Sequence, residues 1–228
     1  MTRYAVISEP VRYRTAGELL SACLYRPQLP NPQPGLLLIQ DGWELDNHAK
    51  GVAERLAHVG YVTLAVDAHP GELESPPAGA QSFECAETNM RAAVAWLRAR
   101  TFVKDGITGS IGLGQGGGLA LLLATTAEHV QAAVSIDGDT GALADRAAGV
   151  RAPLLVIDAA AAAHHLPKHG DKLYAALSAS SLPHEFVRYP LAARSFCDEC
   201  QSVFRPDDAE DAWSRANKFF YKHLGEPG

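Results

Sequence analysis

A glycine-rich stretch at residues 110–119 carries the clearest chemical signal in this sequence, because it runs from an apolar segment into a helical pattern through five glycines. One interpretation is a dinucleotide-binding turn. Gly112, Gly114 and Gly117 fit the pattern GxGxxG, and Asp137 follows at the end of a later strand, where it would contact a ribose. The other interpretation is the nucleophile elbow of a hydrolase, in which Gly114 stands where the reactive side chain belongs. Either turn lets another group approach the backbone closely.

The place of this stretch in the chain favours the elbow. About four predicted strands precede it, whereas a dinucleotide-binding turn usually follows the first strand of its fold. Short apolar or β-branched runs alternate with longer helical patterns throughout the chain, an order that builds a mostly parallel sheet with helices on both faces. The candidate strands are residues 4–8, 19–25, 36–40, 61–66, 109–113, 132–136, 154–158 and 185–189.

The predicted fold class is therefore α/β, with about eight strands. The first two strands should pair antiparallel, because their connection is too short for a crossover helix. Helical patterns begin after Asn47 and close the chain, and residues 119–127 form a helix that is apolar nearly all round and should be the most buried. Since the sequence shows no linker or repeat, we expect a single domain over residues 1–228.

Composition narrows the classes of partner. The formal net charge is −6, and acidic and basic residues are interspersed without a basic block, which argues against nucleic acid or an anionic membrane as the main partner. A small molecule or another protein fits better. The sequence has no apolar run of about 18 residues, and its N-terminus lacks the pattern of a signal peptide, so we expect no membrane span and a cytoplasmic protein.

Several segments, taken in order, resemble the dienelactone hydrolase family from about Leu19 to Leu224. The anchors are a strand and loop at residues 36–43, a helix and strand at 53–57 and 60–67, the glycine turn at 112–120, a loop at 189–196, and a closing helix at 209–220. The resemblance implies an α/β-hydrolase-like fold. It also implies a Cys-His-Asp triad, in which a thiolate attacks the carbonyl of a lactone or ester and histidine moves the protons.

The residues that match the triad positions are different in this sequence. Gly114 stands at the nucleophile position, Arg194 at the histidine position, and Ala163 at the acid position, although a shift within the alanine run would make Asp158 the acid. Glycine has no atom that can attack a carbonyl, and arginine cannot serve as a base near neutrality. Ser110 lies within the strand ahead of the turn and Gln115 is not nucleophilic, so neither replaces the missing nucleophile, whereas Ser195 beside Arg194 stays a candidate. The resemblance therefore implies the family's pocket without its covalent mechanism.

The expected ligand site combines backbone donors with a few side chains. The amides of Gly42 and Gln115 would form an oxyanion hole, and Arg194 would supply a fixed cation for a carboxylate. The predicted ligand is a small carboxylate or lactone-like compound. The full set of ligand-binding candidates is Asp41, Gly42, Trp43, Gln115 and Arg194.

A metal is the alternative, because two cysteines with one or two histidines can bind zinc. The candidate ligands are Cys197, Cys200, His164, His165 and His69. The remaining histidines are interpreted as surface residues: His48, His58, His129, His169, His184 and His223. Apart from this zinc alternative, no cofactor is expected.

Three hypotheses follow. The first is a dienelactone-hydrolase-like protein that binds a small anionic molecule without the family's chemistry. The second is an enzyme of changed chemistry in the same pocket, such as a metal-assisted hydrolase, a lyase or an isomerase. The third is a nicotinamide-dependent enzyme that uses Gly112, Gly114, Gly117 and Asp137.

Overall fold

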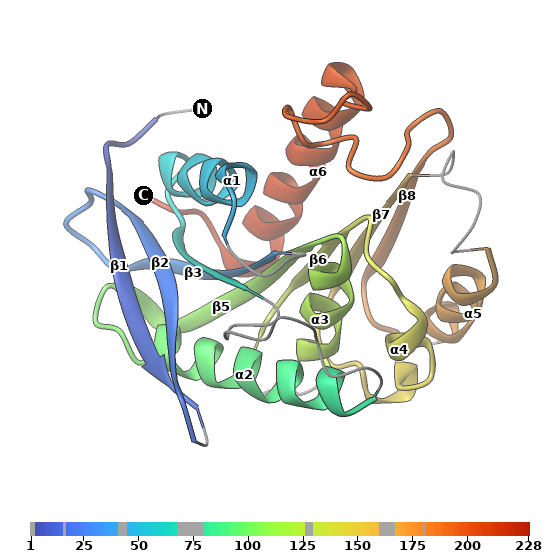
Figure 1. Cartoon of the computed structure of the whole chain (residues 1–228), viewed down its shortest axis with the longest axis horizontal. Helices are drawn as coiled ribbons and strands as arrows, with labels where there is room; N and C mark the ends of the chain where they lie inside the picture. The colour runs from blue at the N-terminus through green and yellow to red at the C-terminus, as the bar shows by residue number, and fades with distance from the viewer. Residues whose placement is uncertain are drawn as a thin grey trace.

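The computed structural model describes residues 3–15, 17–40, 45–67, 80–125, 130–159, 167–179 and 181–228, with the backbone alone for residues 80–83, 142 and 167–172. Its centre is an eight-stranded sheet (Figure 1). The strands are β1 (Val6–Arg14), β2 (Leu19–Pro27), β3 (Gln33–Gln40), β4 (Val62–Asp67), β5 (Val103–Leu113), β6 (Ala133–Ile136), β7 (Leu154–Ala159) and β8 (His184–Tyr189). They lie in the order β1-β2-β4-β3-β5-β6-β7-β8.

Strand pairing follows the prediction for an α/β fold. β1 pairs antiparallel with β2, and β2 pairs antiparallel with β4, while every pairing from β4 through β8 is parallel. The central strand β3 is buried along its whole length, as a parallel strand covered on both faces must be. The mostly parallel sheet and the antiparallel edge are thus confirmed.

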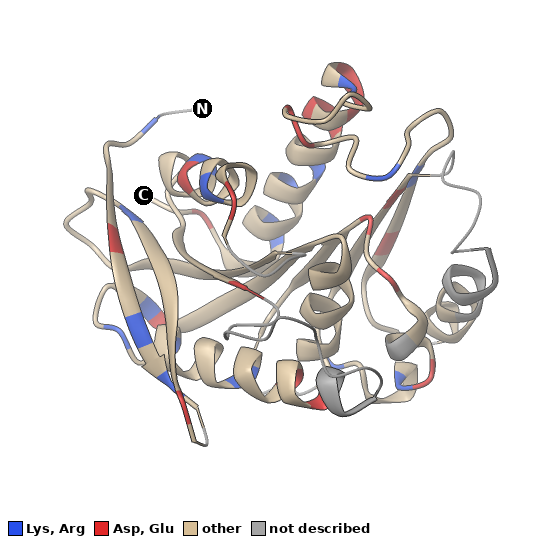
Figure 2. Ribbon diagram, viewed as in Figure 1, with Lys and Arg blue, Asp and Glu red and all other residues tan. Residues whose placement is uncertain are grey.

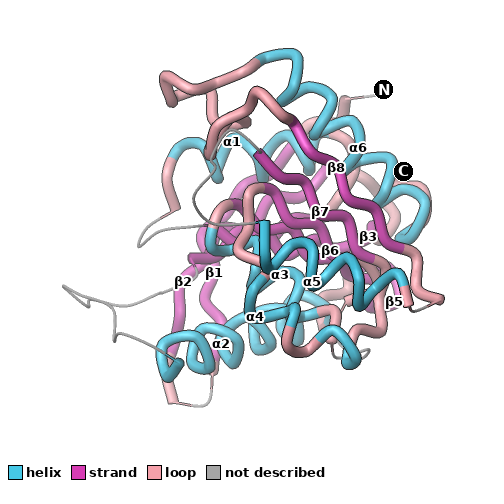
Figure 3. Tube along the Cα trace, turned by 90° about the vertical axis from the view of Figure 1, so that its right-hand side faces the viewer, coloured by secondary structure: helices cyan, strands magenta, loops and turns pink. Residues whose placement is uncertain are grey.

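Helices cover both faces of the sheet, which Figure 3 shows edge-on. The helices are α1 (Asn47–His58), α2 (Ala80–Arg98), α3 (Gln115–Leu123), α4 (Gly141–Ala144), α5 (Pro167–Ser178) and α6 (Pro206–Leu224), with a short 3₁₀ turn at Ala147–Gly149. α1 and α6 lie on one face, and α2 to α5 lie on the other (Figure 1). Each face has its own apolar cluster, because neighbouring strand residues point to opposite sides.

The apolar helix differs from its predicted bounds. We expected it over residues 119–127, but α3 spans Gln115–Leu123 and residues 126–129 lie outside the described part of the chain. The helix starts earlier because the glycines after Gly114 already form its first turn. Its burial is as predicted, since the residues from Gly116 to Leu123 are all buried.

The surface is mixed in charge. Figure 2 shows acidic and basic residues interspersed over the helices and strand ends, without a block of one sign. Among the helices that the structure describes, none has the combined length and apolar character needed to cross a bilayer.

Candidate functional site

The turn between β5 and α3 has the shape of a nucleophile elbow. Gly114 caps α3 with φ 54° and ψ −126°, a conformation open to glycine and strained for other residues. Its N–H donates to the Ile136 carbonyl at 3.0 Å, and its carbonyl accepts from the Gly117 N–H at 3.0 Å. These bonds hold the turn against β6. The geometry of the elbow is therefore present at Gly114 without a side chain to act there.

The neighbouring glycines are required by the packing of the chain on itself. A Cβ at Gly112 would lie 2.0 Å from the Gly116 carbonyl oxygen, and one at Gly116 would lie 2.4 Å from the Ile39 carbonyl oxygen. A Cβ at Gly117 would lie 2.4 Å from Ser135 Oγ. Each distance is under 3.0 Å, which is shorter than the contacts that Cβ atoms make with non-bonded neighbours in folded proteins. The GxGxxG pattern thus has an explanation within the protein, and no pyrophosphate is needed to account for it.

A cavity of about 180 Å³ opens beside Gly114 at the carboxyl ends of β3, β5 and β6. We call it the elbow pocket. Its described lining residues include three aspartates and one histidine, and none of them is a lysine or an arginine. The residues are Gln40, Asp46, His48, Leu113, Gly114, Ile136, Asp137, Ser195, Cys197, Asp198 and Gln201. The described lining is therefore electronegative, apart from any charge on His48.

Asp137 is the most perturbed acid of this pocket. Its Oδ1 accepts the Ala159 N–H at 2.8 Å and its Oδ2 accepts the Ser195 N–H at 3.0 Å. Burial raises the pKa of Asp137 to about 6, although these two hydrogen bonds and the charge of Arg194 act in the opposite direction. Both carboxylate oxygens bind backbone of this chain, so Asp137 fastens the loop after β8 to the ends of β6 and β7.

Asp158, the alternative acid, lies outside the elbow pocket. It precedes the last residue of β7 and shares the sheet face of Val156, whereas the pocket residue Ile136 belongs to the cluster on the other face. Its Oδ2 is 3.7 Å from Nη2 of Arg188 on β8. Burial raises the pKa of Asp158, and Arg188 lowers it. The other acid candidate, Ala163, lies outside the described residues.

The ligand-binding candidates separate into two groups. Asp41, Gly42 and Trp43 lie outside the described residues, so the structure does not test them. Gln115 and Arg194 are exposed, and neither belongs to the described lining of the elbow pocket. Of the predicted site residues, Gly114, Asp137, Ser195 and Cys197 are the ones that the structure brings together there.

Cys197 and Cys200, the cysteines proposed as metal ligands, lie in different environments. Cys197 is buried and lines the elbow pocket, whereas Cys200 is exposed. Burial, with a smaller contribution from Asp137, raises the pKa of the Cys197 thiol well above its usual range, which disfavours the reactive thiolate. The described residues contain no group of three or more His, Cys, Asp or Glu side chains placed to hold a metal. His69, His164 and His165 lie outside them, so zinc binding stays a prediction.

His48 was wrongly interpreted as a surface residue. Its side chain is 14% exposed and lines the elbow pocket, with Nδ1 3.4 Å from Oδ1 of Asp198. His48 stands in the first turn of α1, which Asp46 caps by accepting the Ala49 N–H at 2.8 Å. The Asp46 N–H in turn donates to Gln40 Oε1 at 2.9 Å, so α1 begins directly against the end of β3.

Asp198, the partner of His48, is fixed by backbone hydrogen bonds. Its Oδ1 accepts the Cys200 N–H at 2.9 Å, and its own N–H donates to the Ser195 carbonyl at 2.9 Å. A sequence signal for His48 did exist, since it opens the helix that follows a buried parallel strand. Asp198 gave no such signal, because it lies in an irregular loop 150 positions further along the chain.

Comparison with known proteins agrees with this architecture. The profile of the dienelactone hydrolase family matches residues 20–224. A provisionally named carboxymethylenebutenolidase of Methylorubrum extorquens is 26% identical over 221 residues, covering 86% of this chain and 75% of that protein. The crystal structure of a dienelactone hydrolase from Anabaena variabilis superposes with a TM-score of 0.73 at 20% identity, covering 96% of this chain and 99% of that one. A dienelactone hydrolase-like promiscuous phosphotriesterase from metagenomic libraries gives a TM-score of 0.84 at 21% identity, covering 97% and 100%.

Proposed function

Since the chain belongs to the dienelactone hydrolase family, we propose that it binds a small, uncharged or cationic lactone-like compound in the elbow pocket without forming a covalent acyl intermediate. The observation that carries the proposal is Gly114. It lines the pocket at the position of the nucleophile in the elbow, and it has no side chain that could attack a ligand. The butenolide in the name of the Methylorubrum relative, a carboxymethylenebutenolidase, supports a lactone as the ligand class. The carboxyl group in the same name is an acid, so the preference for an uncharged ligand rests on the pocket lining alone.

The charge of the pocket changes our expectation of the ligand. We expected an anion because Arg194 matches the family's histidine position. Arg194 is exposed, however, and the described lining carries Asp46, Asp137 and Asp198 with no basic residue other than His48. A carboxylate placed among these side chains would meet like charges in a partly desolvated cavity. A neutral ring with hydrogen-bond donors fits this lining better.

Calorimetry with two matched ligands tests the proposal. We expect neutral 5-(hydroxymethyl)-2(5H)-furanone, whose hydroxyl is a donor, to bind more tightly than the same ring with a carboxylate in place of the hydroxymethyl group. The variant Asp46→Asn keeps a helix-capping residue while it removes one negative charge, so it should narrow the difference between the two ligands. Intact-protein mass spectrometry after exposure to a chromogenic ester should show no acyl adduct. A stable adduct in the pocket, or tighter binding of the carboxylate, would contradict the proposal.

The His48–Asp198 pair favours a second candidate function, hydrolysis by an activated water. With Nδ1–H directed toward Asp198, His48 Nε2 is the basic nitrogen. It would accept a proton from water as the water oxygen forms a bond to the carbonyl carbon. When the tetrahedral intermediate collapses, the bond to the leaving alcohol breaks and the alkoxide recovers that proton from His48. The nucleophile is water, so the missing side chain at Gly114 does not prevent this reaction.

Turnover measured apart from binding distinguishes the two candidates. If the protein hydrolyses esters with an activated water, His48→Gln lowers ester turnover on the order of 100-fold, since a positioned general base contributes about 10²–10⁴ in rate. The matched control is His58→Gln on the same helix. His58 does not line the pocket, and its Nδ1 lies 2.7 Å from the Tyr4 carbonyl oxygen. Equal effects of both variants, or no turnover by the native protein, would leave binding alone as the function.

A further inference from the structure

Strand β3 buries two glutamines, Gln33 at its first residue and Gln40 at its last. Gln33 has partners at both ends of its amide, since Nε2 donates to the Asn31 carbonyl at 2.9 Å and Oε1 accepts the Gly228 N–H at 2.7 Å. Gln40 has a partner at one end, because its Oε1 accepts the Asp46 N–H at 2.9 Å. The strand therefore carries a fully paired amide at one end and a half-paired amide at the other.

The unpaired end of the Gln40 amide belongs to the elbow pocket. Gln40 lines this cavity, and its Nε2 has no hydrogen-bond partner among the described residues. Nor is Nε2 one of the unpaired polar atoms that the described protein buries completely, so it is accessible from the cavity. Because the Asp46 N–H fixes the oxygen end, the two N–H groups of the amide are left for a ligand.

The register of the sheet places this donor next to the elbow. Ile39 pairs with Gly112 where β3 lies parallel to β5, so Gln40 lies level with Leu113, one residue before Gly114. Leu113 and Gly114 line the pocket together with Gln40. A ligand beside the glycine turn therefore has the Gln40 amide on the β3 side of the cavity.

Hydrogen-bond donors are scarce in the rest of the described lining. The Gly114 N–H donates to the Ile136 carbonyl, the Ser195 N–H donates to Asp137, and the Asp198 N–H donates to the Ser195 carbonyl. The ionised aspartates of the lining are acceptors only. A ligand that offers an acceptor consequently depends on a side-chain donor.

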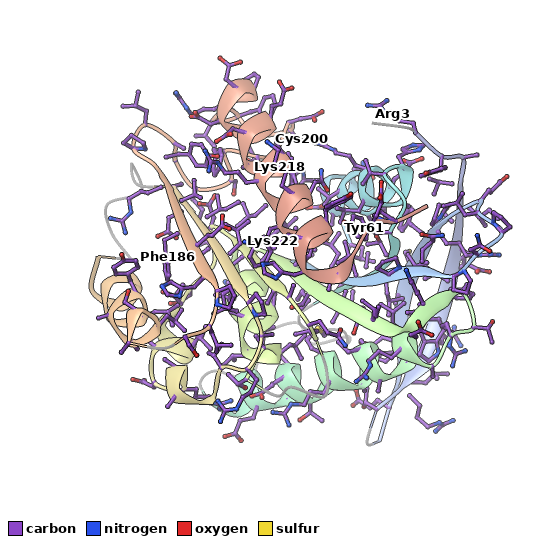
Figure 4. The ribbon with its side chains drawn as sticks, turned by 180° about the vertical axis from the view of Figure 1, so that it is seen from behind. Arg3, Tyr61, Phe186, Cys200, Lys218 and Lys222 are labelled. Atoms are coloured by element: carbon purple, nitrogen blue, oxygen red, sulfur yellow. The ribbon has the colours of Figure 1, made fainter. Side chains whose placement is uncertain are left out.

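Gln201 and His48 also line the pocket, but neither is a fixed donor as Gln40 is. Gln201 is exposed on the loop after β8, one residue from Cys200, which Figure 4 shows beside α6. His48 has Nδ1 3.4 Å from Asp198, and with the proton of the neutral ring on Nδ1 its Nε2 is an acceptor. Gln40 is buried and anchored by a backbone N–H, so its donor has a defined position.

We propose that Gln40 determines the specificity of the elbow pocket by donating from Nε2 to the carbonyl oxygen of the ligand. This inference rests on the proposed function, and it names the group that the pocket recognises. A ring without that oxygen would cover the amide and leave its N–H groups unpaired in a partly desolvated cavity, which is costly. The pocket thereby selects a lactone over a cyclic ether of the same shape.

Calorimetry with a matched pair of rings tests this role. The lactone is 5-(hydroxymethyl)-2(5H)-furanone, and its counterpart is the cyclic ether that has a methylene group in place of the carbonyl. At pH 8 the native protein should bind the lactone at least about tenfold more tightly than the ether. Because the two rings are compared within one protein, a loss of affinity common to both cancels.

Three variants separate the donor from other effects. Gln40→Met removes the donor at similar length, and Gln40→Glu removes it while an oxygen remains for the Asp46 N–H. In both variants the preference for the lactone should fall below about threefold. The matched control is Gln131→Glu, since Gln131 Oε1 also accepts a backbone N–H, that of Thr108 at 2.8 Å, but does so outside the pocket. This control should keep the native preference.

Infrared difference spectra report the hydrogen bond itself. The carbonyl stretching frequency of the bound lactone should be higher in Gln40→Met than in the native protein, because a donated hydrogen bond weakens the carbonyl bond. Equal frequencies, or a lactone preference that survives in both Gln40 variants, would overturn the role of Gln40. Equal binding of both rings by the native protein would also overturn it and leave the proposed function standing. If the native protein bound neither ring, the proposed function would fail and this inference with it.

Discussion

The buried carboxylate of Asp137 makes the unfolding free energy depend on pH in a defined direction. Burial raises its pKa from 3.8 to about 6 in the folded protein. One pKa unit corresponds to about 1.4 kcal/mol, so the shift is equivalent to about 3 kcal/mol. The pKa of Asp137 is higher in the folded protein than in the unfolded chain, so protonation stabilises the folded protein. This contribution to the unfolding free energy is fully present below pH 3.8. It is lost as the pH rises through about 6.

The variant Asp137→Asn isolates this contribution. Asparagine is neutral at every pH, but its side chain can accept only one of the two N–H groups that Asp137 holds, those of Ala159 and Ser195. We expect a constant penalty of about 1–3 kcal/mol for the lost hydrogen bond. The penalty should dominate near pH 4 and be largely offset near pH 8, where the native protein buries a charge.

Urea denaturation from pH 4 to pH 8 measures the difference. The unfolding free energy of the native protein minus that of Asp137→Asn should fall by about 2.4 kcal/mol across this range, because at pH 4 the unfolded-state carboxyl is already mostly ionised. Asp139→Asn serves as the control, since Asp139 is exposed two positions along the chain. The unfolding free energy of the native protein minus that of Asp139→Asn should vary by less than about 1 kcal/mol from pH 4 to pH 8. If the Asp137→Asn difference stays constant from pH 4 to pH 8, the argument from burial is refuted.

Two further predictions concern packing and thiol reactivity. Gly112→Ala should destabilise the fold by about 4 kcal/mol or more in urea denaturation, because its Cβ would lie 2.0 Å from the Gly116 carbonyl oxygen. Gly51→Ala, with open space around the new Cβ in helix α1, should be neutral or stabilising by up to about 1 kcal/mol; equal losses would contradict the close contact. Iodoacetamide at pH 8 should alkylate exposed Cys200 well before buried Cys197, as peptide mapping by mass spectrometry would show. Early modification of Cys197 in the folded protein would mean that the loop around it opens.

The sequence by itself determined the fold and the position of the elbow. Alternation of short apolar runs with helical patterns is local information, and it located all eight strands. The glycines around Gly114 predicted a close approach of another group to the backbone. About four predicted strands precede this turn, which favoured a hydrolase elbow over a dinucleotide-binding turn. The absence of a side chain at Gly114 is itself a property of the sequence. These features were predictable because each depends on residues that are neighbours in the chain.

Only the tertiary structure decided which side chains share the pocket. His48 and Asp198 meet because the carboxyl ends of parallel strands bring the start of α1 and the loop after β8 to one edge of the sheet. Arg194 and Ser195 are adjacent in the chain, yet Ser195 lines the pocket and Arg194 does not. Side-chain direction in an irregular loop has no sequence period, since it is set by long-range hydrogen bonds such as the one from the Ser195 N–H to Asp137. For that reason the charges of the described pocket lining could not be predicted before the chain was folded.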